Sequence, residues 1–235
     1  MRIAALIAGS LLVAGCSAAG GSHAGHTQTS TAASPGTSSG TSSITAPSAS
    51  KPPGPSFAPA AGAGISDVIA WIEAAHPADP ARYHSATRDG VTTALGSDIA
   101  FAVNAGPGGP IVCTTDAKHS GSALACLVSL TNPPPRPETA YGEWQGGWVD
   151  FAGTTLQIGS ARGDPGQFVY GNGAELASGD SLSYDDYRCR ADQAGLYCVN
   201  YAHQSAVRLR SAGIDPFGCL RSVPPPDGVG TAFGC

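Results

Sequence analysis

The sequence predicts a mainly β fold: an antiparallel β-sandwich or partly closed barrel with one or two N-terminal helices, stapled by disulfides. Short apolar segments with alternating polarity follow one another between residues 98 and 210, a pattern typical of strands. Clusters of Gly, Asp and Asn separate them at the short intervals expected of hairpin turns. Six cysteines lie between residues 113 and 235, and an even number in an exported chain indicates disulfides.

Residues 1–15 are expected to be a lipoprotein signal peptide. Arg2 precedes an apolar run, residues 3–13, which is shorter than the about 20 residues that span a bilayer. The sequence around Cys16 resembles a bacterial lipobox, whose cysteine receives a diacylglycerol and whose new amino terminus is often acylated. We therefore expect a protein that is lipid-anchored at Cys16 to the extracytoplasmic face of the cell membrane. The alternative is an ordinary secretory signal with an incidental cysteine.

Residues 16–63 are expected to form a disordered tether. Of the 47 residues after Cys16 in this segment, 41 are Ser, Ala, Gly, Thr or Pro, so little can be buried to offset the entropy of ordering. Residues 36–40 match the hydrolase pattern G-x-S-x-G, but the strand and helix that this motif needs around it are missing. His23 and His26 make a weak metal pair on such a chain.

The charge balance argues against a nucleic-acid partner. Without Arg2 the chain has 11 basic and 17 acidic residues, a formal charge of -6, whereas phosphate binding needs clustered Lys and Arg. Apolar residues make up 42% of the chain, which is enough for a globular core.

The first periodic segment predicts an amphipathic helix within residues 64–77, with Ser66 as its N-cap and Pro77 as its stop. A second short helix or turn is expected over residues 79–87, with Pro80 in its first turn. Beyond it, nine strands are expected: Asp98–Val103, Pro110–Thr115, Ala123–Leu130, Trp148–Phe151, Thr155–Gly159, Gln167–Tyr170, Leu182–Arg190, Leu196–Asn200 and Ala206–Arg210.

Hairpin geometry selects two disulfides among the fifteen pairings that six cysteines allow. If Cys189 faces Cys198, residues 192–195 remain as a four-residue turn that begins with Asp and ends with Gly. If Cys113 faces Cys126, residues 118–121 form a similar turn that ends with Gly. Facing residues in a non-hydrogen-bonded antiparallel pair have Cα atoms about 4.5 Å apart, within the range that a disulfide spans.

Cys219 and Cys235 then remain to pair with each other; the alternative is a free or intermolecular Cys235. The spacings of the other cysteines do not suit a structural zinc site, and no C-x-x-C redox motif is present. No metal or cofactor is therefore expected. His203 is expected on a loop after the second cysteine hairpin.

The two cysteine hairpins, the proline-rich stretch Pro133–Pro137 and the segments Phe168–Gly173 and Ser205–Gly213 resemble the exported cysteine-hairpin domains of actinobacteria. Together with the lipobox, the tether and the sequence ISDVIAWIEAAHPADPARYHSATRDG, the chain resembles a mycobacterial lipoprotein of the LppI type. The resemblance implies a globular domain over residues 64–219 with residues 220–235 as a C-terminal Pro-rich tail. It implies no established reaction.

Candidate binding residues are Tyr141, Trp144 and Trp148, which lie where related domains often carry another cysteine pair. They stand beside the proline-rich stretch, and aromatic side chains next to such a segment are typical of interaction sites. The alternative is that Trp144 and Trp148 belong to the core.

No catalytic residues are predicted. Asp185 and Asp186 are adjacent in a predicted strand, so their side chains would point to opposite faces. We expect a binding or envelope-associated module with an unknown envelope or protein ligand; the alternative is an envelope hydrolase with an unrecognised active site. A cleft that holds His84, His119 or His203 with a carboxylate and a hydroxyl within hydrogen-bond reach would favour the hydrolase.

Overall fold

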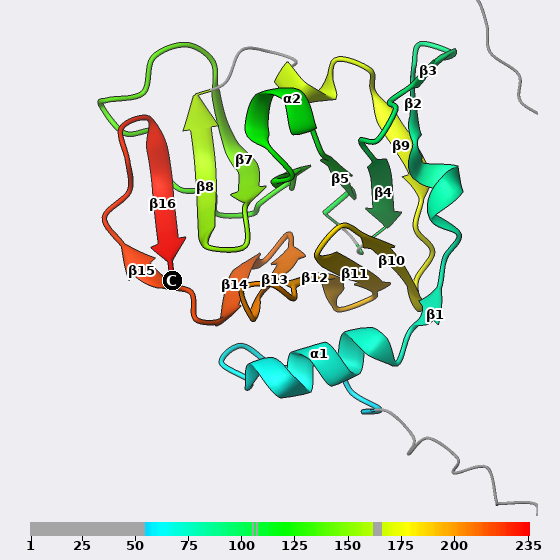
Figure 1. Cartoon of the computed structure of the whole chain (residues 1–235). Coiled ribbons are helices and arrows are strands. Elements are labelled where there is room, and N and C mark those ends of the chain that lie inside the picture. Colours follow the sequence, from blue (N-terminus) through cyan, green and yellow to red (C-terminus); the bar gives the residue numbers. More distant parts are fainter. Residues whose placement is uncertain (1–54, 105, 107, 162–165) are drawn as a thin grey trace, which may run out of the picture. The chain divides into compact units, whose positions relative to one another are not determined.

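The computed structural model describes residues 55–235, except 105, 107 and 162–165, and places them in three layers (Figure 1). Helix α1 (Ile65–Glu73) lies against a six-stranded sheet, and that sheet faces a ten-stranded sheet. The predicted mainly β, sandwich-like fold is confirmed, but the strands do not close into a barrel. The signal peptide, Cys16 and the tether up to residue 54 lie outside the described residues.

Helix α1 is confirmed, although both of its predicted ends are wrong. Gly64 is the N-cap residue, because its carbonyl already accepts from the Val68 N–H, and Ser66 therefore lies inside the first turn. The helix ends before Pro77 because the chain turns into strand β1 (His76–Pro77), where the His76 N–H donates to the Gly179 carbonyl at 3.1 Å. Strand pairing thus ends the helix earlier than the proline requires.

The chain ahead of α1 is bound to the six-stranded sheet. The Tyr197 hydroxyl donates to the Pro59 carbonyl at 2.8 Å, and the Arg208 guanidinium donates to the same oxygen at 3.3 Å. Arg208 is itself 2.7 Å from the Asp215 carboxylate. The folded domain therefore begins before residue 64, where the sequence predicts its start.

The six-stranded sheet has the order β1-β10-β11-β12-β13-β14, with β1 parallel to β10 and every other pair antiparallel. Its remaining strands are β10 (Asp180–Tyr184), β11 (Tyr187–Asp192), β12 (Gly195–Asn200), β13 (Ser205–Arg210) and β14 (Gly213–Gly218). The single strand predicted over residues 182–190 is wrong, because Asp185 and Asp186 form a turn and Tyr184 pairs with Tyr187. Asp185 has a φ of 41°, a left-handed conformation that Asp tolerates.

The ten-stranded sheet has the order β15-β16-β8-β7-β6-β5-β4-β9-β2-β3. One pair, β4 with β9, is parallel, so this sheet also departs from a purely antiparallel arrangement. Its strands are β2 (Ser85–Arg88), β3 (Val91–Ala94), β4 (Ala100–Asn104), β5 (Pro110–Thr114), β6 (Leu124–Leu127), β7 (Trp144–Phe151), β8 (Thr155–Ala161), β9 (Asn172–Glu175), β15 (Arg221–Val223) and β16 (Val229–Gly234).

Two segments differ from their sequence-based expectation. Residues 220–235 are not a tail: β16 pairs with β8 and buries Val229 and Ala232. Residues 167–170 are not a strand: the short helix η2 (Gly166–Phe168) turns Phe168 onto the sheet. The short helix expected over residues 79–87 is present only as η1 (Pro80–Tyr83), with the Asp79 carboxylate accepting from the Ala81 N–H, and residues 85–87 belong to strand β2.

Three apolar clusters hold the layers together. The largest lies between the two sheets and includes Phe101, Leu156, Leu196 and all four hairpin cysteines. A second lies between α1 and the six-stranded sheet, where the rings of Trp71 and Tyr197 have centroids 4.6 Å apart. A third, smaller cluster on the outer face of the ten-stranded sheet is formed by Ala125, Trp148 and Phe168.

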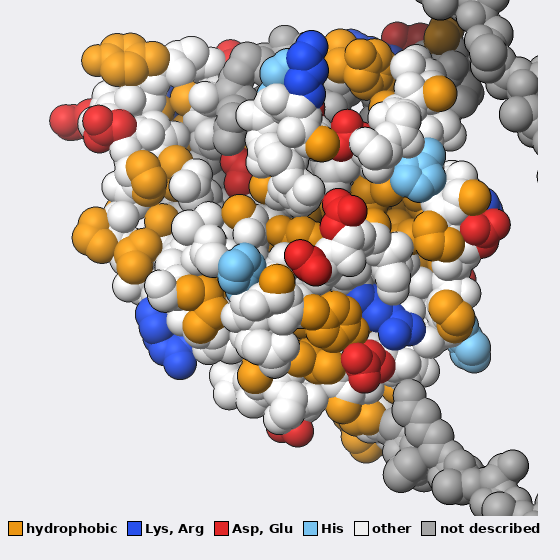
Figure 2. Space-filling view, in the orientation of Figure 1, with side chains coloured by type: hydrophobic (Ala, Val, Ile, Leu, Met, Phe, Trp, Pro, Cys, Tyr) orange, Lys and Arg blue, Asp and Glu red, His pale blue; other side chains and the backbone are white. Residues whose placement is uncertain are grey.

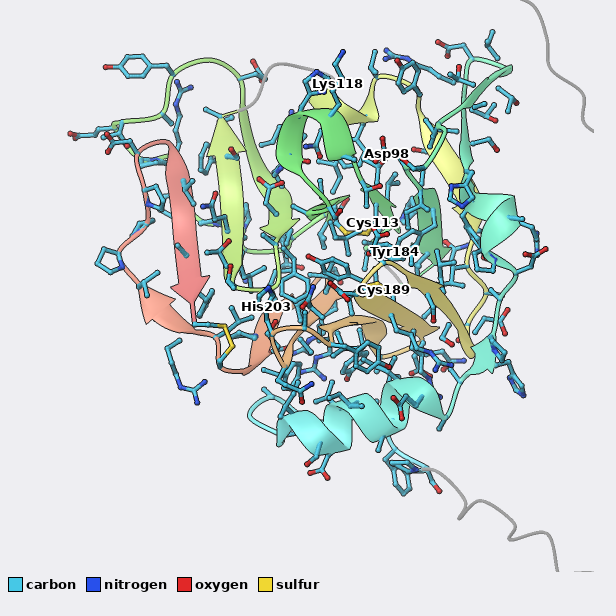
Figure 3. The ribbon with its side chains drawn as sticks, viewed as in Figure 1. Asp98, Cys113, Lys118, Tyr184, Cys189 and His203 are labelled. Carbon is cyan, nitrogen blue, oxygen red and sulfur yellow. A yellow bond between two sulfur atoms is a disulfide. The ribbon has the colours of Figure 1, made fainter. Side chains whose placement is uncertain are left out.

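All three predicted disulfides are present. Cys113–Cys126 and Cys189–Cys198 join directly facing residues of neighbouring strands, with Cα atoms 4.1 and 4.0 Å apart, and Cys219–Cys235 has a Cα distance of 4.8 Å. In Figure 3, Tyr184 lies between the two sheets, with Cys113 on one side and Cys189 on the other.

The turns of the two cysteine hairpins differ in how well the sequence predicts them. In the second hairpin the predicted register is confirmed, and Asp192 closes the turn by accepting from the Ala194 N–H at 3.0 Å. In the first, the four-residue turn predicted over residues 118–121 is wrong. Pairing stops at Thr114 with Ala125, and the short helix α2 (Ala117–Ser120) follows. Asp116 caps α2, and this cap competes successfully with continued strand pairing.

Replacing Cys189 and Cys198 together with Ala should lower the free energy of unfolding by about 3 kcal/mol, because a short closed loop is lost from the unfolded state. Urea unfolding measures the change, and Ser183→Ala and Gln193→Ala together serve as a control in the same hairpins.

Disulfide mapping by mass spectrometry without reductant should give the three pairs described above. Six free thiols would contradict the fold.

Candidate functional site

A pocket of about 600 Å³ opens on the outer face of the ten-stranded sheet. Three segments far apart in the sequence surround it: the end of β3 with the following loop, the passage from β5 into α2, and η2 with the residues after it. Figure 3 shows Asp98 and Lys118 near α2, at the end of the domain remote from α1. The volume lies within the range of about 300 to 1,000 Å³ common for small-molecule sites.

Two buried threonines at the end of β5 form the floor of this pocket. The Thr114 hydroxyl donates to the Ile99 carbonyl at 3.0 Å, and the Thr115 hydroxyl donates to Asp98 Oδ1 at 3.0 Å. Asp98 Oδ1 also accepts from the Ala117 N–H at 2.8 Å. The Asp98 carboxylate therefore holds the start of α2 against the sheet while it lines the pocket.

An acidic residue and a histidine pair at the pocket rim. Asp116 Oδ2 lies 2.8 Å from His119 Nδ1, and Asp116 Oδ1 accepts from the His119 backbone N–H at 3.2 Å. Because the carboxylate can only accept, Nδ1 carries the proton and Nε2 remains available. Lys118 stands between them in the sequence, and Figure 2 shows a basic and a histidine side chain together over α2.

The remaining wall is apolar. Trp148 is 3% exposed, and Phe168 packs edge-on against it, with ring centroids 5.1 Å apart at 82°. Val169 and Tyr170 follow Phe168 and remain about half exposed at the rim. Gly166 has a φ of 56°, and a Cβ there would stand 3.2 Å from the Trp148 ring. A glycine at this position therefore lets η2 approach the indole closely.

The structure separates the three aromatic residues proposed from the sequence. Tyr141 is 87% exposed. Trp144 is half-buried and packs with Pro134 over Gly159, where a Cβ would lie within 2.9 Å of both rings. Trp148 is a core residue, as the alternative interpretation held, yet it also lines the pocket. The three therefore do not form one exposed aromatic surface.

The residues that would indicate a hydrolase are only partly assembled. His119 has its carboxylate partner, His84 Nδ1 lies 2.9 Å from the Asp98 backbone carbonyl, and His203 lines a separate cavity of about 260 Å³. Among the described residues, none of these imidazoles is hydrogen-bonded to a side-chain hydroxyl. An activated serine needs such a bond.

His203 shares its cavity with Asp185 and Asp186 from the β10–β11 turn. The two carboxylates therefore lie in a turn and not on opposite faces of a strand, which corrects the prediction. Within residues 55–235, apart from the six left undescribed, no group of three His, Cys, Asp or Glu side chains could hold a metal ion. The same residues contain no helix with the length and apolarity to cross a bilayer.

Comparisons with known protein families, with curated proteins and with solved structures found no match to this chain. The site therefore has to be interpreted from its own geometry. Sequence reasoning missed Asp98, Lys118 and Gln167, because the loops that carry them meet only in the folded domain. Asp116 and His119 did carry a local signal: an Asp three residues before the His is the spacing of a helix cap.

Burial between the sheets raises the pKa of Tyr187 to about 12, and its hydroxyl donates to the Phe151 carbonyl at 3.1 Å. The unfolded chain has the ordinary tyrosine pKa of about 10. This contribution to stability is therefore complete below about pH 10 and is lost as the pH rises toward about 12, because only the unfolded chain ionises readily.

Tyr187→Phe should consequently make the free energy of unfolding fall less steeply between about pH 10 and pH 12 than in the wild type. Urea unfolding at each pH measures the slope. Tyr141→Phe, at an exposed position, should leave the wild-type slope unchanged. Equal slopes for wild type and Tyr187→Phe would contradict the buried placement of this ring.

Proposed function

We propose that this protein is an exported domain, anchored to the cell membrane through a lipid on Cys16, that binds a small ligand in the pocket beside α2. The observation that carries the proposal is the pocket itself, with its polar floor of Thr114, Thr115 and Asp98 and its apolar wall around Trp148. Apolar walls with a few placed polar groups are typical of ligand sites. The three disulfides support an oxidising, extracytoplasmic location.

The fold holds the residues that line this pocket in fixed positions. The floor belongs to central strands of the ten-stranded sheet, and Asp98 fixes α2 to that floor. Binding elements held by a rigid scaffold lose little conformational entropy when a ligand arrives. This arrangement favours a binding pocket that exists before the ligand arrives over one that forms only around its ligand.

A second candidate function is hydrolysis, favoured by one observation: the Asp116–His119 pair leaves His119 Nε2 available as a general base at the rim of the pocket. A bound molecule recovered intact from the protein would support the binding function. A molecule that the wild type cleaves and His119→Ala leaves intact would support hydrolysis instead.

Cys16→Ala should move the protein from the membrane fraction to the soluble fraction, because the thiol that receives the diacylglycerol is lost. Fractionation and immunoblotting measure the distribution, and the intact mass should decrease by the lipid. Ser17→Ala, beside the proposed lipid site, should remain with the membrane. Membrane retention of Cys16→Ala would contradict the anchor.

Ala94→Trp should block ligand binding, because Ala94 is exposed at the pocket rim and a large side chain there would fill the opening. Native mass spectrometry of the full lipidated protein, purified in detergent from its own host, should show an adduct in the wild type that is lost in this variant. Ala202→Trp, exposed on another loop, is the matched control and should keep the adduct. Equal adducts in all three proteins would contradict binding in this pocket.

A further inference from the structure

The deepest polar groups of the pocket can only accept hydrogen bonds. The hydroxyl protons of Thr114 and Thr115 are already donated within the domain, to Ile99 and Asp98. Thr115 Oγ1 also accepts from the Ile99 N–H at 3.0 Å, so each hydroxyl oxygen has only its remaining acceptor capacity left. Asp98 contributes a carboxylate. Gln167 Oε1 is buried and has no hydrogen-bond partner among the residues that the structure describes. A buried acceptor without a partner costs about 1 to 3 kcal/mol, so a ligand that fits this floor has to donate.

The rim of the pocket, in contrast to its floor, supplies a hydrogen-bond donor. Lys118 has donors only, whereas His119 Nε2 is an acceptor, because Asp116 engages the protonated Nδ1. Both side chains are exposed at the pocket mouth. A ligand that reaches from the floor to the rim therefore has to donate at one end and accept at the other.

The charges disfavour ionic ligands of either sign. An anion would meet the carboxylates of Asp98 and Asp116, and a cation would meet Lys118 at the opening. A neutral hydroxyl group donates and accepts with the same oxygen, so it satisfies both regions without a net charge.

The apolar wall fits the remainder of such a ligand. Leu95, Trp148, Val169 and Tyr170 are among the residues that line the pocket. Sugar rings present C–H groups on their faces and hydroxyls at their edges, and C–H faces pack against apolar and aromatic side chains.

From these four features we propose that the pocket binds a saccharide: a neutral, polyhydroxylated ring whose hydroxyls donate to Asp98, Gln167 and His119 Nε2 and accept from Lys118. This inference rests on the proposed ligand-binding function and adds the chemical class of the ligand. It assigns a specific role to Gln167, whose buried oxygen gains its partner only when the ligand is bound.

Saturation-transfer NMR with the full lipidated protein in detergent micelles tests the class of ligand. The probes are maltose, chitobiose and mannobiose as neutral saccharides, spermidine as a cation and inorganic phosphate as an anion. We expect at least one disaccharide to bind, with loss of binding in Ala94→Trp. Gln167→Met, which keeps the side-chain length without the acceptor, should weaken that binding about tenfold. Gln193→Met, at an exposed turn, should leave it unchanged.

Each other outcome overturns the inference. Suppose that spermidine or phosphate binds the wild type but not Ala94→Trp, and that no disaccharide binds. The ligand-binding function would then stand, and the saccharide would be rejected. Disaccharide binding that Gln167→Met leaves unchanged would reject the assigned contact. If none of the five probes binds, the saccharide is rejected, and the adduct measurement with Ala94→Trp decides separately whether the pocket binds a ligand at all.

Discussion

Strand β12 is buried along its whole length, and the layers on either side of it are arranged to cover its two faces. Leu196 and Cys198 point toward the ten-stranded sheet, whereas Tyr197 and Val199 pack against α1. The guanidinium of Arg190 stands 3.6 Å from the centroid of the Trp71 ring, so a cation–π contact also joins β11 to α1. Loss of α1 would expose one complete face of the central strands, so the helix and the sandwich have to fold as one unit.

The disulfides complement this packing in different ways. Cys113–Cys126 and Cys189–Cys198 each join neighbouring strands of one sheet, so they fix register and leave the contact between sheets to apolar side chains. Cys219 follows β14 of the smaller sheet and Cys235 follows β16 of the larger one. Among the disulfides of the described residues, Cys219–Cys235 alone joins one sheet to the other. The pocket lies on the outer face of the larger sheet. Its floor residue Thr114 belongs to β5, the strand that Cys113–Cys126 holds in register with β6.

Local signals predicted the parts of the fold that depend on nearby residues. The sequence separation of 9 between Cys189 and Cys198 determines the register of their hairpin, and the periodicity of α1 reflects one buried face. Pairing of β16 with β8 and of β9 with β4 brings together segments about 70 residues apart and has no such signal. The candidate site shares this difficulty: its floor comes from β5, but Gln167 reaches it only because η2 folds back over Trp148.

The attachment of Pro59 has a mechanical consequence. Its carbonyl is hydrogen-bonded by Tyr197 and Arg208, which belong to β12 and β13, two strands in the interior of the sheet order. A pull on the chain ahead of Pro59 is therefore transmitted to strands that are paired on both sides and not to an edge strand such as β14. Peeling an edge strand breaks its ladder one bond at a time, whereas loading the middle of a sheet strains several bonds together. If the proposed anchor holds this domain to a membrane, shear at the cell surface reaches it where it resists unfolding best.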